Sequence, residues 1–176
     1  MDKSFWDKKS VFLTGHTGFK GGWLAHWLSM LGANVHGYSL NPNPGPNFFK
    51  ATNLEDRLSS SIIGDIRDLD KISLSIKKSK ADILIHMAAQ PIVRSSYQDP
   101  IETFSTNVIG TANVLESIRQ TDTVRAIVNI TTDKCYENKE WTKPYKEDDR
   151  LGGHDPYSAS KACAELVSSA FHKSFL

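Results

Sequence analysis

A glycine-rich turn near the amino terminus constrains the fold of this chain more than any other feature. Gly15, Gly18 and Gly21 follow an apolar segment at 9–14 and precede residues 23–31, where apolar side chains recur at helical spacing. Gly18 lets a pyrophosphate approach the backbone, Gly21 lets helix and strand pack closely, and the helix amino terminus offers N–H donors. The pattern predicts a dinucleotide-binding turn between a buried strand and a helix.

An ordinary tight turn between a strand and a helix is the alternative on spacing alone. A P-loop is excluded, because Lys20 is not preceded by glycine and no serine or threonine follows it. Thr17, Phe19 and Lys20 lie within the same turn, so the dinucleotide interpretation places them at the cofactor as well.

Strand-like and helix-like segments alternate along the whole chain. Strands are predicted at 9–14, 34–40, 60–63, 81–87 and 124–130, and helices at 23–31, 69–78, 99–119 and from 155–156 onward. Irregular loops are expected at 41–47, which holds three prolines, and at 131–154. This alternation predicts an α/β fold, a doubly wound, Rossmann-like parallel sheet of about five strands with helices on both faces. No linker or repeat interrupts residues 1–176, so we expect a single dinucleotide-binding domain.

Composition excludes several classes of function. The formal net charge of +1 indicates no long-range attraction to nucleic acid or to an anionic membrane. The amino terminus lacks the apolar run of a signal peptide and no stretch is long enough to span a bilayer, which favours a cytoplasmic location. Cys135, Cys163 and the six scattered histidines have no metal-ligand spacing, so no metal site is predicted.

A tyrosine and a lysine four residues apart form the strongest catalytic signal. Tyr157 and Lys161 would lie on one face of the last predicted helix, where the ammonium favours the phenolate and lowers the pKa of the phenol. Tyr157 is then a candidate general base near neutral pH. Thr132, Asp133 and Lys134 follow the fifth strand, at the edge of the sheet where such folds bind ligands. The alternatives are an ordinary amphipathic helix face and a surface salt bridge between Asp133 and Lys134.

The ends of the second and third strands carry candidate contacts to the adenosine half of a dinucleotide. By register, Ser39 meets the ribose, where an acidic residue is usual. Because no arginine stands beside it to accept a 2′-phosphate, the sequence favours NAD without excluding NADP. Asp65 could accept a hydrogen bond from the adenine amino group, with Ile66 against the ring. A helix-capping role is the alternative for Asp65.

Residues beyond the fourth strand are candidates for the middle of the cofactor site. Ala88, Ala89 and Gln90 would leave room for the cofactor, although a close-packed strand end explains the small side chains equally simply. Asn107, within the long predicted helix, could fix a backbone kink or a water beneath the site. A solvated asparagine on the helix surface is the alternative.

Taken together, these residues resemble the extended short-chain dehydrogenase/reductase superfamily, and within it the CDP-glucose 4,6-dehydratases. Residues 14–23, 132–138 and 151–158 carry the resemblance, which runs from about Lys8 to the last residue. Lys134 after Asp133 is among its most specific parts. The sister enzymes acting on dTDP-glucose have Thr-Asp-Glu at that place, so the lysine indicates the CDP-sugar branch.

The resemblance implies an internal redox cycle that converts CDP-D-glucose to CDP-4-dehydro-6-deoxy-D-glucose. Tyr157 would take the proton of the C4 hydroxyl while hydride passes to NAD, Lys161 would hold the ribose, and Thr132 would hydrogen-bond the C4 oxygen. Water would then leave across C5 and C6, with Asp133 as the general acid. Lys134 would be either the base at C5 or a group that orients Asp133. The role of base requires burial or a nearby cation to lower the pKa of Lys134. The product would serve bacterial deoxysugar and O-antigen synthesis.

The resemblance also implies partners and a missing part. A homodimer is expected through a four-helix bundle of residues 101–119 and 157–173, together with a carboxy-terminal substrate domain that this chain lacks. We therefore expect the chain alone to bind dinucleotide weakly and not to turn over CDP-glucose. Two alternative functions remain. The chain could belong to another nucleotide-sugar epimerase, dehydratase or decarboxylase, or it could be a non-catalytic dinucleotide sensor.

Overall fold

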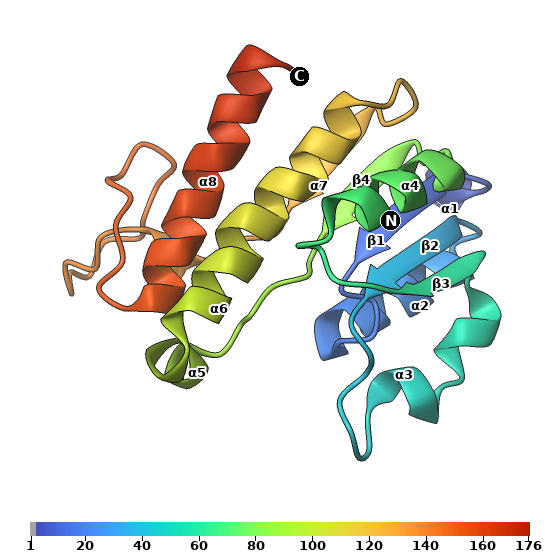
Figure 1. Ribbon diagram of the computed structural model, residues 1–176, viewed down its shortest axis with the longest axis horizontal. Helices are drawn as coiled ribbons and strands as arrows, with labels where there is room; N and C mark the ends of the chain where they lie inside the picture. Colours follow the sequence, from blue (N-terminus) through green and yellow to red (C-terminus); the bar gives the residue numbers. More distant parts are fainter. Residues whose placement is uncertain (1–2) are drawn as a thin grey trace.

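A five-stranded parallel sheet forms the centre of the computed structural model, which describes residues 3–176 (Figure 1). The strands lie in the order β3-β2-β1-β4-β5, and every neighbouring pair is parallel. This arrangement confirms the doubly wound α/β fold predicted from the sequence. The strands are β1 (Ser10–Thr14), β2 (Asn34–Ser39), β3 (Ser60–Ile63), β4 (Ile83–His86) and β5 (Ala126–Asn129).

The long helices lie within a few residues of their predicted positions, whereas several short ones are additions. Five short helices have no counterpart in the prediction, because elements of three to six residues are too brief to display a period. The helical elements are α1 (Lys3–Trp6), α2 (Phe19–Met30), α3 (Phe48–Ala51), η1 (Leu54–Arg57), α4 (Leu69–Ser79), α5 (Val93–Gln98), α6 (Pro100–Phe104), η2 (Ser105–Ile109), α7 (Gly110–Arg119), η3 (Asp133–Cys135) and α8 (Pro156–Ser174).

Aspartate side chains fix where three of the helices begin. Asp68, Asp99 and Asp155 stand immediately before α4, α6 and α8, and each carboxylate accepts the backbone N–H three residues on. Each such cap contributes about 1 kcal/mol. Pro100 and Pro156 occupy the first position of their helices, where a missing N–H costs nothing.

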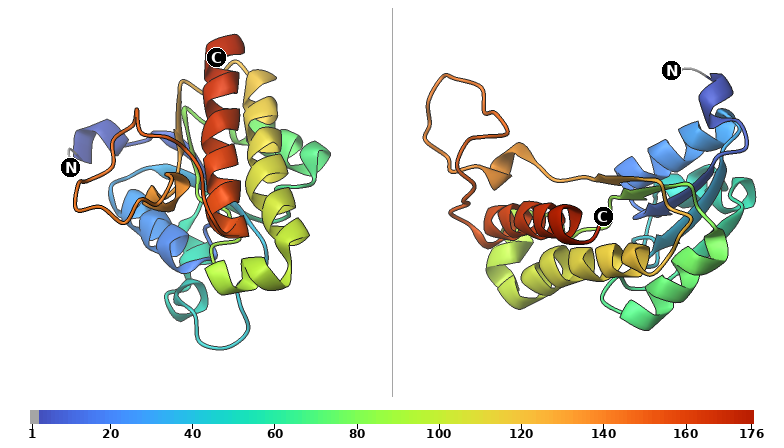
Figure 2. Two further views of the ribbon diagram at one scale, coloured as in Figure 1. Left: turned by 90° about the vertical axis from the view of Figure 1, so that its left-hand side faces the viewer. Right: turned by 90° about the horizontal axis from the view of Figure 1, so that it is seen from above.

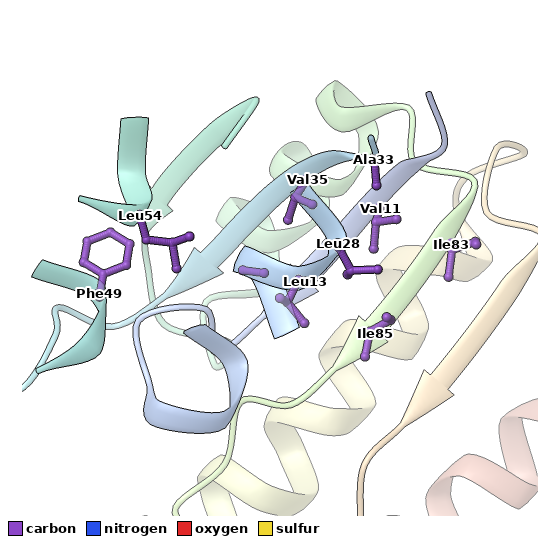
Figure 3. Packing of buried hydrophobic residues seen from close by; sticks show 10 residues of the cluster. Val11, Leu13, Leu28, Ala33, Val35, Phe49, Leu54, Ile83 and Ile85 are labelled. Carbon is purple, nitrogen blue, oxygen red and sulfur yellow. The ribbon is translucent and has the colours of Figure 1, made fainter. Parts of the chain in front are cut away.

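Successive side chains along each strand point to opposite faces of the sheet, which divides the core into two layers. Val11 and Leu13 of β1 pack against α2, while Phe12 between them packs against α4 and α7 on the other face. Figure 2 shows α2 and α4 on opposite sides of the sheet. Figure 3 shows the layer beneath α2, where Leu28 of the helix meets the side chains of β1, β2 and β4.

Two glycines of the first turn occupy places that no side chain could fill. Gly15 has φ +84°, and a Cβ there would lie 2.9 Å from the Ala88 nitrogen. A Cβ at Gly21 would lie 2.1 Å from the carbonyl oxygen of Gly15. The turn therefore brings α2 into backbone contact with the end of β1, as the glycine spacing predicts.

The helices and the polar side chains of the described residues show neither a membrane span nor a metal-binding cluster. Within residues 3–176, none of the helices combines the length and apolar character needed to cross a lipid bilayer. The same residues hold no group of three or more histidine, cysteine, aspartate or glutamate side chains arranged to bind a metal ion. The cytoplasmic location stays a prediction.

Candidate active site

The carboxyl edge of the sheet opens into a cavity of about 860 Å³. Every residue predicted to bind the cofactor lines this cavity, with the exception of the buried Asn107. Tyr157 and Lys161 of α8 share the cavity with the glycine turn, although Tyr157 lies 136 positions after Gly21 in the sequence. The lining also includes residues that the sequence did not suggest, among them Asn41, Asn47, Glu102, Thr106 and Thr131.

The amino terminus of α2 suits an anionic group. Gly18 is the residue before the helix and has no side chain to cap it, so the N–H groups of the first turn keep no side-chain partner there. Phe19, Lys20 and Gly21 of that turn line the cavity. A helix amino terminus with free donors and a partial positive charge is the usual site for a pyrophosphate. The residues present therefore fit the phosphates of a dinucleotide.

A buried histidine that sequence analysis missed holds the ends of β1 and β4 together. His86 Nδ1 lies 2.7 Å from Thr14 Oγ1, and His86 Nε2 lies 3.2 Å from Thr111 Oγ1. The Thr111 hydroxyl donates its only proton to the Asn107 carbonyl, so Nε2 must be the nitrogen that carries hydrogen. Nδ1 then accepts from Thr14, whose oxygen accepts the N–H groups of residues 87 and 88 at the cavity floor. The sequence signal that could have indicated this role is the position of His86, a polar residue that ends the otherwise apolar strand β4.

We expect the free energy of unfolding to fall as the pH drops below about 6.5. Burial, aided by the charge of Lys161, lowers the pKa of His86 from 6.5 to about 3, and burial lowers the pKa of His16 to about 4. The unfolded chain therefore binds protons that the folded chain excludes, at about 1 kcal/mol per pH unit for each histidine. Urea unfolding at pH 8, 7 and 5 measures the free energy of unfolding at each pH. We expect equal values at pH 8 and 7 and a lower value at pH 5. The drop between pH 7 and pH 5 should be smaller in His86→Gln. Equal stability at pH 7 and 5 would contradict it.

Asn107 occupies a π-helical turn in the middle of the predicted long helix. The sequence predicted one helix over 99–119, whereas the structure has α6, the wider turn η2 and then α7. Asn107 is 2% exposed, so the solvated alternative is wrong. Its amide accepts from the Gln90 N–H at 2.8 Å and donates to the Gln90 carbonyl at 3.1 Å and to Ser160 Oγ at 2.8 Å. Asn107 thus ties the loop after β4 to α8, while its link to the cofactor stays a prediction.

The structure brings Tyr157 close to both Thr132 and Lys161, but the pKa of Tyr157 shifts in the direction opposite to the one predicted. Burial raises the pKa of Tyr157; a hydrogen bond with the Thr132 side chain opposes this, and the charges of Asp133 and Asp155 raise the pKa further. The prediction that Lys161 lowers the pKa of this phenol is wrong in this structure. Lys161 donates instead to the Ile130 carbonyl at 3.2 Å, and burial lowers its own pKa.

Asp133 and Lys134 lie in a second hollow of about 280 Å³, which Tyr136, Asp155 and Ser158 also line. Both side chains are exposed, and no ion pair includes either of them in the part of the chain that the structure describes. Thr132 Oγ1 donates to Asp133 Oδ1 at 3.1 Å, which links this hollow to Tyr157.

The surroundings that the sequence analysis required for a Lys134 base are not found. That role needed burial or a neighbouring cation, whereas Lys134 is exposed. Its charge instead acts on a carboxylate, Asp155. Burial raises the pKa of Asp155, but hydrogen bonds from Ser158 and the charge of Lys134 outweigh this and lower it overall.

Asp65 is held by an arginine at the adenosine end of the cavity. The Arg67 guanidinium and its backbone N–H both donate to the Asp65 carboxylate, and hydrogen bonding to Arg67 lowers the pKa of Asp65. The helix-capping alternative is wrong, because Asp68 caps α4. Arg67 also pairs with Glu102. Ile66 is buried against Gly110, so contacts of Asp65 and Ile66 with adenine stay predictions.

Comparison with known proteins decides the family. Residues 12–176 match the sequence profile described as GDP-mannose 4,6 dehydratase. The chain belongs to this dehydratase family. Within the family, the CDP-glucose 4,6-dehydratase of Salmonella typhimurium is 55% identical over 175 residues, which are 99% of this chain and 48% of that protein. The chain spans about half or less of the length of the curated relatives that it matches.

Solved structures of nucleotide-sugar enzymes share the fold of this dehydratase-family chain. DesIV from Streptomyces venezuelae, a dTDP-glucose 4,6-dehydratase with NAD and TYD bound, is 26% identical with a TM-score of 0.81, covering 94% of this chain and 52% of DesIV. MoeE5 in complex with UDP-glucose and NAD is 28% identical with a TM-score of 0.75, covering 92% and 48% of the two chains.

Proposed function

We propose that this chain is the dinucleotide-binding part of an NAD-dependent enzyme that dehydrates CDP-D-glucose to CDP-4-dehydro-6-deoxy-D-glucose. The observation that carries the proposal is the place of Tyr157 and Lys161 in the same cavity as the glycine turn. The identity of 55% to the Salmonella dehydratase supports the substrate, and the NAD bound to DesIV and MoeE5 supports the cofactor. The product would enter bacterial deoxysugar and O-antigen synthesis.

The oxidation at C4 of the hexose rests on Tyr157, Thr132 and Lys161. A bound nicotinamide ring would supply reversible storage of a hydride, taken from C4 and given back at C6 after water has left, so that the reaction has no net oxidation. The Tyr157 oxygen takes the proton of the C4 hydroxyl, and the Thr132 hydroxyl holds the C4 oxygen beside it. Lys161, whose amine is held at the Ile130 carbonyl on the cavity wall, binds the ribose hydroxyls next to the ring.

The loss of water across C5 and C6 rests on Asp133 and Lys134. A ketone at C4 acidifies the proton at C5, so elimination needs a base there and an acid at the C6 oxygen. Asp133 gives a proton to that oxygen, and the Thr132 hydroxyl at 3.1 Å orients its carboxyl group. Lys134 is exposed beside Asp133, where it is placed to orient the carboxyl group. For Lys134 to take the C5 proton as well, the bound sugar must shield its amine from water and so lower its pKa.

Turnover of CDP-glucose in the presence of NAD tests the proposal. The complete protein should produce a 4-keto sugar, detected by its ultraviolet absorbance in alkali, and dTDP-glucose should be a much poorer substrate. Omitting NAD is the control for cofactor that copurifies. Absence of any keto product from CDP-glucose, with NAD binding intact, would contradict the proposed reaction.

We further propose that the enzyme is a homodimer built on α6–η2–α7 and α8. The two helical stretches pack side by side (Figure 1). They carry three exposed apolar side chains, Ile101 (76%), Ile109 (55%) and Leu166 (59%). Paired with the same face of a second copy, they would form a four-helix bundle. Ile101→Glu should convert the dimer to monomer in analytical ultracentrifugation, whereas Leu74→Glu, at a similarly exposed position on α4, should not. A monomeric wild type would refute this interface.

A further inference from the structure

The hydroxyl groups of Thr17 and Ser39 form a hydrogen-bonded pair at the adenosine end of the cavity. Thr17 lies in the glycine turn and Ser39 ends β2, and their oxygens are 2.7 Å apart. Thr17 Oγ1 also lies 2.8 Å from the carbonyl oxygen of Leu40, which can only accept. Both hydroxyl residues line the cavity, and both are 7% exposed.

Counting protons fixes the direction of this chain of bonds. A threonine hydroxyl has one proton, and that proton goes to the Leu40 carbonyl. Ser39 must therefore donate its own proton to Thr17 across the 2.7 Å contact. What remains on Ser39 Oγ is a lone pair, so toward the cavity this hydroxyl can accept a hydrogen bond but cannot donate one. Ser39 thus presents to a ligand the hydrogen-bonding character of a carboxylate oxygen without its charge.

An acceptor at this position distinguishes the two nicotinamide dinucleotides. The end of the second strand is where this fold meets the adenosine ribose, whose 2′-hydroxyl in NAD carries a proton to give. The 2′-phosphate of NADP carries acceptors only, and an acceptor facing it is left unpaired. The nearby Asn47 amide cannot serve the phosphate, since it donates to the carbonyls of Asn43 and Gly45.

We propose that Thr17 is the positioning residue that makes Ser39 an acceptor for the 2′-hydroxyl of NAD and so sets the preference for NAD over NADP. This inference rests on the proposed function only in taking a dinucleotide as the ligand. It gives a physical basis to the expectation that the sequence favours NAD without excluding NADP. Lys20, a cation on the cavity lining, is unchanged in all the variants below and so cannot account for their differences.

Calorimetric titration with NAD and with 2′-deoxyadenosine NAD tests the contact with Ser39. Wild type should bind NAD about threefold to tenfold more tightly than the deoxy analogue, as one hydrogen bond allows. In Ser39→Ala the two ligands should bind equally, so that the preference disappears in a double-mutant cycle. A preference that survives in Ser39→Ala would overturn the inference. These titrations use the complete protein, and its failure to bind any dinucleotide would overturn the proposed function as well.

Variants at Thr17 test the orientation of the Ser39 proton. In Thr17→Val the Ser39 hydroxyl is released to donate, so the ratio of the NADP and NAD dissociation constants should fall about threefold to tenfold from the wild-type ratio. Thr17→Ser keeps a hydroxyl and should retain the wild-type ratio. A general weakening of the fold would change both constants together and leave their ratio unchanged. An unchanged ratio in Thr17→Val would therefore refute the role of Thr17.

Discussion

Replacing Tyr157 with phenylalanine is expected to lower kcat for CDP-glucose by about 10²–10⁴-fold, the usual loss on removing a general acid–base group. The substitution keeps the buried ring and removes only the oxygen that contacts Thr132. The oxidation at C4 then has no group to take the hydroxyl proton. Turnover is followed by the absorbance of the 4-keto product, and NAD binding is titrated separately so that lost affinity is not mistaken for lost chemistry.

Two further variants complete the Tyr157 experiment. Tyr97→Phe removes a phenol oxygen from an exposed position on α5 and should leave kcat unchanged. Thr132→Val removes the hydrogen bond that lowers the pKa of Tyr157, so the pH at which kcat rises should move upward. Wild-type turnover by Tyr157→Phe would show that another group takes the proton.

Replacing Asp133 with asparagine is expected to lower overall turnover by at least about 100-fold while sparing the first oxidation. An amide cannot give a proton to the departing C6 oxygen, whereas Tyr157 and Lys161 are untouched. The reduced nicotinamide should therefore accumulate, which its absorbance reports in a single turnover. Loss of both steps together would instead indicate that the variant misplaces Thr132, its hydrogen-bond partner.

The same variant separates a dehydratase from other nucleotide-sugar enzymes. An epimerase or a decarboxylase has no elimination for Asp133 to assist, so near-normal turnover of Asp133→Asn would contradict the proposed reaction. Asp148→Asn is the matched control, because it makes the same chemical change at an exposed position in the loop that follows.

Local patterns in the sequence predicted the parts of the fold that depend on short stretches of chain. The glycine turn and the strands are each encoded within a few residues, and each was found near its predicted position. The position of Tyr157 beside the cavity also followed, because parallel strands bring their carboxyl ends to one edge.

The remaining features depend on contacts between distant segments. His86 holds Thr14 and Thr111, and nothing near it in the sequence indicates either partner. The pKa of Tyr157 depends on burial and on two carboxylates, which the spacing to Lys161 does not reveal. The Thr17–Ser39 pair likewise joins residues 22 positions apart, so the direction of its protons could be read only from three-dimensional geometry.

The wide turn at Ser105–Ile109 has a consequence for how this helix tolerates length changes. A π turn holds one residue more than the α-helical turn it replaces, and each residue rotates a helix by about 100°. Deleting a single residue there would either swing the Asn107 amide off the Gln90 backbone or rotate the apolar face of α7 away from the sheet. The extra residue lets Asn107 face the Gln90 backbone while the apolar side of α7 still faces the sheet. A chain with one residue fewer or more at this point would have to rotate either α6 or α7 about the helix axis to keep both contacts.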